Sequence, residues 1–184
     1  MRCDRIRAQF TTPNCPAKRS HTMNIRVVLG PIPCLLVTIA TFGCGRDEVA
    51  ANGLRKVFFL PHHPREQVRF SLTSADVHLV SLKPELEGLI LPSKAYGVFA
   101  AGRPMIFMGA ADGEIGRLLV EADCGEVVRS GDCDALVSSI LGMMNAPDRG
   151  EAMGQRARAL FEQRFSKTAA LAAWDRLLVE AGNR

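Results

Sequence analysis

The sequence contains few aromatic residues and no spacing that is typical of a metal site. Aromatic side chains make up 6% of the 184 residues, so a core must depend on Leu, Val, Ile, Ala and Met. The six cysteines include no Cys-x-x-Cys pair, and the four histidines lie at no ligand spacing beside them. These absences argue against a zinc site. In a chain of this size the cysteines are interpreted as the reduced thiols of a cytoplasmic protein.

An even spread of charge is also lacking. Six of the 23 Lys and Arg residues, but one of the 19 acidic residues, fall in residues 1–26, which leaves 17 basic and 18 acidic residues beyond them. Because no basic face with interleaved aromatics is present, nucleic acid is not an expected partner. Residues 1–26 lack any hydrophobic period, and residues 1–34 are predicted to be an unstructured or atypical segment. Residues 35–184 are predicted to form one domain, with enough chain for one core.

A long uninterrupted apolar run is missing as well. The apolar stretch 27–40 follows a basic segment, as in a signal peptide or a membrane anchor. It contains Gly30, Pro31 and Pro33, however, and is shorter than a membrane-spanning helix requires. The alternative interpretation is a β-strand that follows an unstructured stretch. Fractionation of a tagged chain would distinguish an anchored protein from the other interpretations.

The chain does contain a regular alternation of short apolar runs and amphipathic segments. Continuous apolar runs predict strands at residues 35–42, 57–60, 77–81, 104–108 and 126–128. Helices are predicted at residues 64–74, 93–101, 114–123, after a cap at Asp132, and at 149–165 and 167–181. Strands that are apolar throughout and alternate with helices are typical of a parallel sheet covered on both faces. The predicted fold class is therefore α/β, a Rossmann-like parallel sheet flanked by helices, with further helices at the C-terminus.

Ligands of such sheets bind beyond the carboxyl ends of the strands. Three predicted loops lie there, at Gly43–Gly45, Leu82–Ser93 and Gly109–Glu114. Gly43 and Gly45 allow the backbone to approach a phosphate closely, although any tight strand-to-helix turn also favours glycine.

The helix that opens near Ser93 directs free backbone amides toward the strand ends, which creates an anion site. Ser93 adds a hydroxyl group. Lys94 adds a positive charge in the first turn, where the helix dipole disfavours it. A nearby diphosphate would account for that charge, and the alternative is a solvated lysine after a proline turn.

Several other polar residues have two possible roles. The carboxylate of Glu87, beside Gly88, can accept hydrogen bonds from sugar hydroxyls, or it can be a surface acid. Asp112 is predicted to be a helix N-cap. Glu114 is either a first-turn acid favoured by the helix dipole or a carboxylate that faces a ribose. His78, inside a strand, is predicted to be buried and hydrogen-bonded rather than a catalytic base.

Taken together, several segments resemble glycosyltransferase family 4, and in particular its colanic-acid and exopolysaccharide type. The segments are FFLPHHPREQV, SADVHLVSLKPELEGLILPSKAYGVFAAGRPMIFMG, DGEIGRLLVEADCGEVV and MGQRARALFEQRFS, and the likeness covers about residues 54–181. The resemblance implies the C-terminal, donor-binding Rossmann domain of an enzyme with the two-domain GT-B fold. Such an enzyme transfers a sugar from a nucleotide diphosphate sugar to a saccharide or lipid-linked acceptor in polysaccharide or glycoconjugate synthesis.

The resemblance also implies a set of contacts. The family's first donor glutamate matches Glu87, whereas the position of its second, ribose-binding glutamate is occupied by Gly97. The site residues implied are Glu87 and Gly88 for the donor sugar, Gly43, Gly45, Ser93 and Lys94 for the diphosphate, and Tyr96 and Glu114 for the nucleotide and ribose. No metal and no further cofactor is implied. The location implied is the cytoplasm or the inner face of the membrane, with peripheral membrane association through a missing or separate N-terminal domain.

Nothing before residue 35 resembles the acceptor-binding domain, which in this family usually supplies the catalytic base. No catalytic residue is therefore predicted, and we expect this chain alone to show weak or no transfer. The last helices of the family often pack on that domain, so Trp174 or its neighbours are expected to be exposed. The first alternative is a catalytically incomplete nucleotide-binding module that acts only with a separate acceptor domain. A second, a flavodoxin-like receiver, lacks its acidic cluster after the first strand.

Overall fold

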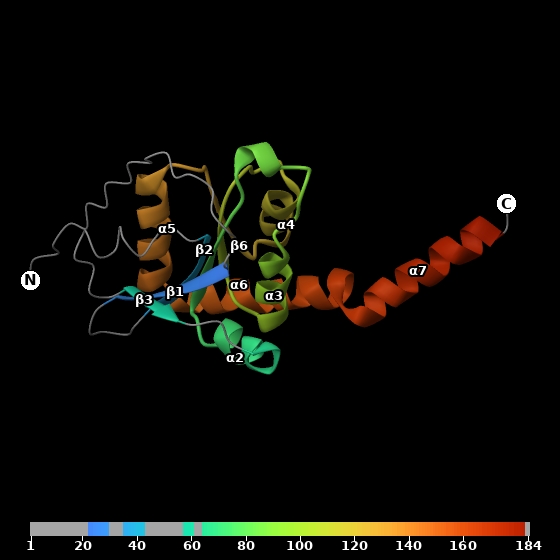
Figure 1. The fold of residues 1–184 in the computed structure, drawn as a ribbon, viewed down its shortest axis with the longest axis horizontal. Helices are drawn as coiled ribbons and strands as arrows, with labels where there is room; N and C mark the ends of the chain where they lie inside the picture. Colours follow the sequence, from blue (N-terminus) through green and yellow to red (C-terminus); the bar gives the residue numbers. More distant parts are fainter. Residues whose placement is uncertain (1–21, 30–34, 43–56, 61–63, 183–184) are drawn as a thin grey trace, which may run out of the picture.

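The computed structural model describes residues 22–29, 35–42, 57–60 and 64–182. These residues form one mixed sheet with helices on both of its faces (Figure 1). The strands follow the order β3-β1-β2-β4-β5-β6 across the sheet. Their bounds are β1 Thr22–Leu29, β2 Leu35–Phe42, β3 Val57–Leu60, β4 Val77–Ser81, β5 Met105–Met108 and β6 Gly125–Val128.

Most of the predicted helices begin and end within a few residues of the expected positions. The helices are α2 Val68–Thr73, α3 Ser93–Ala101, α4 Glu114–Ala122, α5 Cys133–Asn145, α6 Pro147–Leu160 and α7 Lys167–Gly182. Short 3₁₀ turns, η1 Arg65–Gln67 and η2 Pro84–Leu86, and a π-helical turn, η3 Phe161–Phe165, complete the elements. The Asp132 cap is confirmed, because its Oδ1 accepts a hydrogen bond of 2.9 Å from the amide of Ala135.

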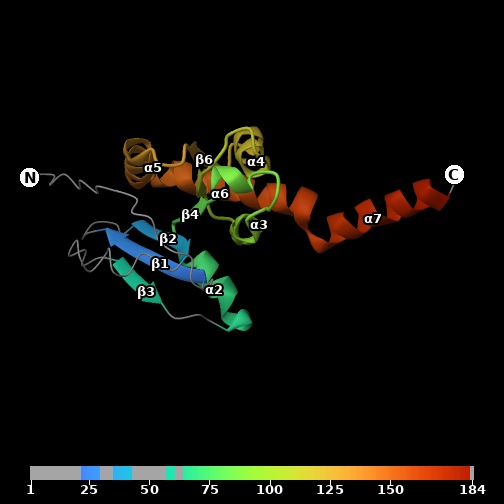
Figure 2. The same ribbon diagram turned by 45° about the horizontal axis from the view of Figure 1, so that its top comes forward.

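The predicted parallel sheet is confirmed for β2, β4, β5 and β6, which pair in parallel in that order. β1 differs, because it pairs antiparallel with both β2 and β3. Figure 2 shows these three strands together at one side of the molecule. The prediction of an unstructured stretch within residues 1–34 is wrong for residues 22–29, which form β1. Met23, Ile25 and Val27 alternate there with polar residues, which is the period of a strand. The domain division at residue 34 stays a prediction.

The apolar stretch 27–40, the basis of the signal or anchor alternative, falls in β1 and β2, with residues 30–34 outside the described part of the chain. Within the described residues, no helix combines the length and the apolar character needed to cross a membrane.

The sheet is buried on both faces because alternate residues of β4 and β5 enter different cores. Val80, Met105 and Phe107 pack with α3 and α4 in one cluster. Val77, Leu79 and Ile106 pack with Met143 of α5 and Met153 of α6 in the other. This arrangement explains why both strands read as continuous apolar runs.

Helix α6 approaches the end of α3 closely at Gly154. A Cβ atom at Gly154 would overlap the backbone carbonyl oxygen of Gly102, which follows α3. We therefore expect Gly154→Ala to lower the free energy of unfolding by about 1–3 kcal/mol, because a backbone atom cannot yield as a side chain can. Chemical denaturation measures this change. Gly142→Ala is the matched control, because a Cβ atom there meets nothing within 4 Å and should stabilise its helix by about 0.5–1 kcal/mol. Equal effects from the two substitutions would contradict the close approach.

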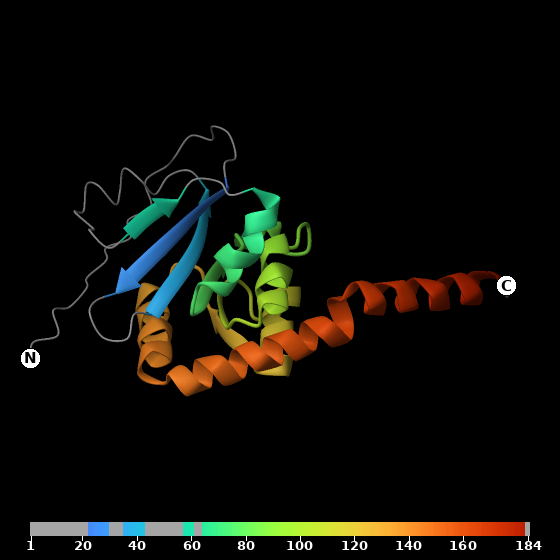
Figure 3. The same ribbon diagram turned by 90° about the horizontal axis from the view of Figure 1, so that it is seen from below.

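Helix α7 continues beyond α6 and projects away from the sheet (Figure 3). No residue of α7 is buried in the described structure, and Trp174 is 62% exposed. The expectation of an exposed Trp174 is thus confirmed. Its exposed apolar neighbours are Leu171, Leu177, Leu178 and Val179.

Candidate functional site

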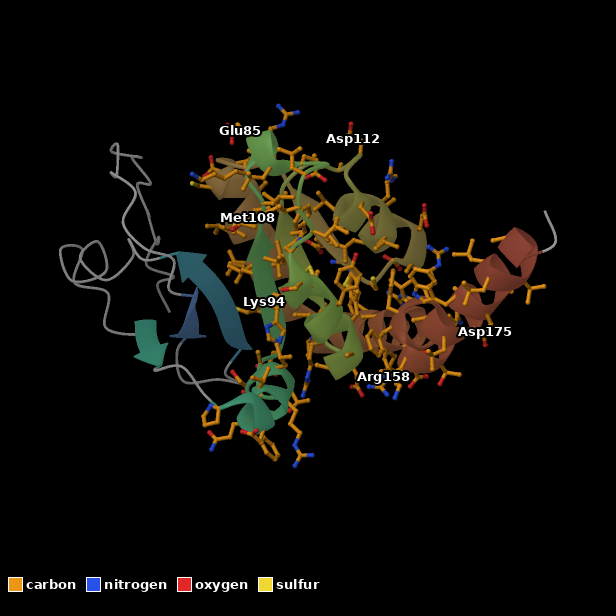
Figure 4. The ribbon with its side chains drawn as sticks, turned by 45° about the vertical axis from the view of Figure 1, so that its right-hand side comes forward. Glu85, Lys94, Met108, Asp112, Arg158 and Asp175 are labelled. Carbon is orange, nitrogen blue, oxygen red and sulfur yellow. The ribbon has the colours of Figure 1, made fainter. Side chains whose placement is uncertain are left out.

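A cavity lies at the carboxyl edge of the parallel strands. It is formed by the chain that follows β4 and by the chain that follows β5, and its volume is about 670 Å³. Figure 4 places Glu85 and Asp112, one from each of these segments, at the same edge of the sheet. The lining residues are Glu87, Gly88, Leu89, Ile90, Leu91, Asp112, Gly113, Glu114 and Arg117. This is the edge at which sheets of this class bind ligands.

The carboxylate of Glu87 connects the two segments. It follows the 3₁₀ turn η2 and lies directly against Gly113, where any Cβ atom would overlap its Oε1 and Cδ. Its Oε2 atom is buried and has no hydrogen-bond partner among the described residues. A buried acceptor without a partner costs free energy, and a donor supplied by a ligand would remove that cost.

Glu114 enters the cavity from the opposite segment. It is the first residue of α4, whose N-cap is Gly113 without a side-chain cap. Its Oε1 atom accepts a hydrogen bond of 3.1 Å from the hydroxyl of Tyr96 on α3. The structure therefore brings together the two residues that were predicted to contact the nucleotide.

The amino end of α3 has no side-chain cap among the described residues, and its N-cap is Pro92. Ser93 is exposed there. The ammonium group of Lys94 turns toward the sheet and donates a hydrogen bond of 3.3 Å to the carbonyl of Leu79 in β4. Burial lowers the pKa of Lys94 to about 8.

Lys94 lies apart from the cavity. Figure 4 shows it nearer to α2 than to Asp112, and it is not among the cavity-lining residues. The predicted site residues thus fall into two groups, with Glu87, Gly88 and Glu114 around the cavity and Ser93 and Lys94 on the first turn of α3. Tyr96 links the groups through its bond to Glu114. Gly43 and Gly45 lie outside the described residues.

Two further predictions about polar residues are settled. The cap at Asp112 is wrong, because Gly113 occupies the N-cap position of α4 and Asp112 lines the cavity instead. His78 is fully buried, and its Nε2 atom lies 2.8 Å from the carbonyl oxygen of Leu72, so its prediction as a hydrogen-bonded core residue is confirmed.

Sequence reasoning missed Arg117 and the apolar residues Leu89, Ile90 and Leu91. Arg117 follows Glu114 by three residues on α4, so both lie on one helix face, and this spacing was the signal available. The three apolar residues are 75%, 49% and 45% exposed. An exposed apolar tripeptide beside a cavity offers a surface for a flat or apolar part of a ligand.

A second cavity, of about 690 Å³, lies at the opposite edge, beside Asp76 and Pro104 where β4 and β5 begin. Both basic residues in its lining bind backbone carbonyls. Arg103 donates to Thr73, and Arg158 donates to Ala100. The amino ends of parallel strands are not where this class of sheet binds ligands, so we assign the candidate site to the carboxyl edge. Among the described residues, no group of three or more His, Cys, Asp or Glu side chains could hold a metal ion.

A Rossmann-like sheet with helices on both faces and long C-terminal helices resembles half of a GT-B glycosyltransferase. The solved structures similar to this chain include a sucrose-phosphate synthase from Thermosynechococcus elongatus, with a TM-score of 0.62 and 22% sequence identity. The similarity covers 82% of this chain and 40% of that protein, so the chain spans less than half of its length. No protein-family model and no curated protein matches the sequence.

Proposed function

We propose that the chain is the donor-binding domain of a glycosyltransferase related to family 4. It binds a nucleotide diphosphate sugar, from which the sugar passes to an acceptor. The observation that supports this proposal best is that Glu87, Gly88 and Glu114, selected from the sequence as donor contacts, line one cavity at the carboxyl edge. The structural similarity to half of a GT-B enzyme supports the same class of function.

The acidic residues around the cavity suit the hydroxyl-bearing part of such a donor rather than its diphosphate. The lining of the cavity contains three acidic residues, Glu87, Asp112 and Glu114, and one basic residue, Arg117. Carboxylates accept hydrogen bonds from hydroxyl groups and repel phosphates. We therefore assign sugar and ribose hydroxyls to the cavity.

The diphosphate belongs at the amino end of α3. Because no described side chain caps α3, the amide and the hydroxyl of Ser93 are donors for phosphate oxygens, and the helix dipole favours an anion there. Lys94, on the same first turn, adds a positive charge, and its ammonium group also donates to the carbonyl of Leu79 in β4. With its charge met by protein groups, the diphosphate requires no metal ion.

The type of polymer, the acceptor and the location are proposed from the sequence segments that resemble family 4. They favour synthesis of an exopolysaccharide of the colanic-acid type, with a saccharide or lipid-linked acceptor and action at the cytoplasmic side of the membrane. The second candidate is a catalytically incomplete module that binds the nucleotide and acts only with a separate acceptor domain. Both candidates predict that the purified chain binds the donor without turnover. A transfer assay with the purified chain and a radiolabelled nucleotide sugar checks this shared expectation, and transfer at an ordinary enzymatic rate would exclude the incomplete module.

Glu87→Gln tests the proposed sugar contact. The substitution keeps the shape of the side chain and removes its charge, so we expect affinity for the nucleotide sugar to fall by roughly tenfold, the usual effect of weakening a hydrogen bond to a charged group. Affinity for the nucleoside diphosphate without a sugar should not change. Isothermal titration calorimetry, after a thermal-shift screen of UDP, GDP and their sugars, provides both values.

Glu85→Gln is the matched control, because it makes the same charge change two residues earlier at an exposed position outside the cavity. It should leave both affinities unaltered. If no nucleotide or nucleotide sugar binds the wild-type chain, the proposed function is wrong. If Glu87→Gln weakens both ligands equally, the assignment of Glu87 to the sugar is wrong.

A further inference from the structure

Tyr96 is the one tyrosine in the sequence, and its side chain connects α3 to α4 beside the cavity. Its hydroxyl donates to Glu114 Oε1 at 3.1 Å. Burial, and then the Glu114 carboxylate, raise the pKa of Tyr96 to about 12. The hydroxyl therefore keeps its proton at neutral pH and remains a hydrogen-bond donor.

The ring of Tyr96 is held from two directions. It makes an edge-to-face contact with Phe99 of α3 at a centroid distance of 6.3 Å and with Phe165 of η3 at 4.9 Å. Phe99 is fully buried in the core. Such contacts prefer defined ring orientations, so the position of the hydroxyl is set by the packing of α3 against η3.

Glu114 has no comparable support from its own helix. It is exposed, it begins α4, and its N-cap is a glycine. A glutamate in that position loses rotamer freedom when it binds a ligand, and this loss reduces affinity. The bond from Tyr96 fixes one carboxylate oxygen before the ligand arrives, and both oxygens retain lone pairs for further donors.

We infer that Tyr96 is a positioning residue that holds the Glu114 carboxylate ready for the adjacent 2′- and 3′-hydroxyls of a ribose, so that the site selects ribonucleotides over 2′-deoxyribonucleotides. This inference rests on the proposed nucleotide-sugar function. The transferred sugar also carries adjacent hydroxyls, so the test must separate the two diols. A nucleoside diphosphate without a sugar contains only the ribose diol.

The experiment compares a ribonucleoside diphosphate with its 2′-deoxy form, using whichever of UDP and GDP the wild-type chain binds more tightly. Calorimetry should show roughly tenfold tighter binding of the ribo form, since the deoxy form leaves part of a charged acceptor unpaired. Tyr96→Phe keeps the ring and its packing and removes the hydroxyl. We expect the ribo-to-deoxy affinity ratio to fall toward one in this variant, and the same in Glu114→Gln.

Ser93→Ala is the control, because a lost diphosphate contact should weaken both forms alike and leave the ratio unchanged. The ratio also does not depend on the fraction of chain that is folded, so a merely structural role for Tyr96 would not alter it. Combining Tyr96→Phe with Glu114→Gln should change the ratio no further than either substitution alone, because both remove the same interaction.

The outcomes separate this inference from the function on which it rests. If the wild-type chain prefers the ribo form and Tyr96→Phe keeps that preference, the positioning role is refuted while the donor function stands. If the wild-type chain binds both forms equally, the ribose assignment of Glu114 is refuted. If it binds no nucleotide at all, the proposed function itself fails.

Discussion

Phe107→Ala is expected to lower the free energy of unfolding by about 3–5 kcal/mol, the usual cost of truncating a buried phenylalanine. Phe107 is fully buried in the middle of β5, within the core shared by the sheet, α3 and α4. The loss combines the transfer free energy of the removed ring atoms with the cost of the cavity that the neighbours cannot fill. Since single domains are stable by only about 5–15 kcal/mol, the variant should melt far below the wild type in urea and on heating.

Phe70→Ala provides the matched comparison for this effect. Phe70 lies on α2 and is 58% exposed, with the Arg69 guanidinium carbon 4.5 Å from its ring centroid. Because an exposed cation–π contact contributes about 0.5–1 kcal/mol, its loss should cost little. Comparable destabilisation by the two substitutions would show that β5 is not the centre of the core.

Donor affinity is expected to fall by roughly tenfold per pH unit above pH 8, because one proton must be taken up on binding. Burial lowers the pKa of Lys94 from 10.5 to about 8, so above that pH the free chain holds a neutral amine. The diphosphate favours the ammonium form and must restore it when it binds. Below pH 8 the amine is already charged, and affinity should be independent of its titration. Calorimetry with the nucleoside diphosphate across pH 7–10 measures the slope.

Titration of Lys94 should also change the free energy of unfolding of the chain without ligand. This free energy should rise with pH, whereas donor affinity falls. The folded pKa lies below the unfolded value, so the unfolded chain binds more protons between pH 8 and 10.5, and stability should rise with pH across that window. Lys94→Gln should remove both dependences, whereas Lys83→Gln, at an exposed lysine, should retain them. A wild-type affinity that is flat from pH 7 to 10 would exclude a diphosphate contact at Lys94.

The order of strands and helices could be predicted because apolar runs and amphipathic segments alternate clearly from residue 57 onward. The strand at Thr22–Leu29 could not be predicted in the same way, because basic composition in the preceding residues obscured a short alternating pattern. Its antiparallel pairing depends on contacts across the sheet with β2 and β3, and a pattern within one segment contains no such information.

The candidate site was predictable in part. Glu87, Gly88 and Glu114 follow strands whose carboxyl ends meet at one edge, so their proximity follows from the fold. The hydrogen bond between Tyr96 and Glu114 joins two helices, and the contact between Glu87 and Gly113 joins two loops. Both depend on how neighbouring elements pack. The side chain of Lys94 turned toward Leu79, which its position in the sequence did not indicate.

The exposure of α7 has a consequence for how the chain unfolds. A helix with no buried residue among those described gains little from the core, so it depends mainly on its own alanine-rich sequence. Isolated helices shorter than about 12–15 residues are marginal in water, and the 16 residues of α7 barely exceed that length. Its backbone amides should exchange with solvent through local fraying, while those of β4 and β5 exchange only when the sheet comes apart. We therefore expect the final segment and the sheet to unfold as two thermodynamic units, and a protease that cuts within α7 should leave the cavity at the carboxyl edge intact.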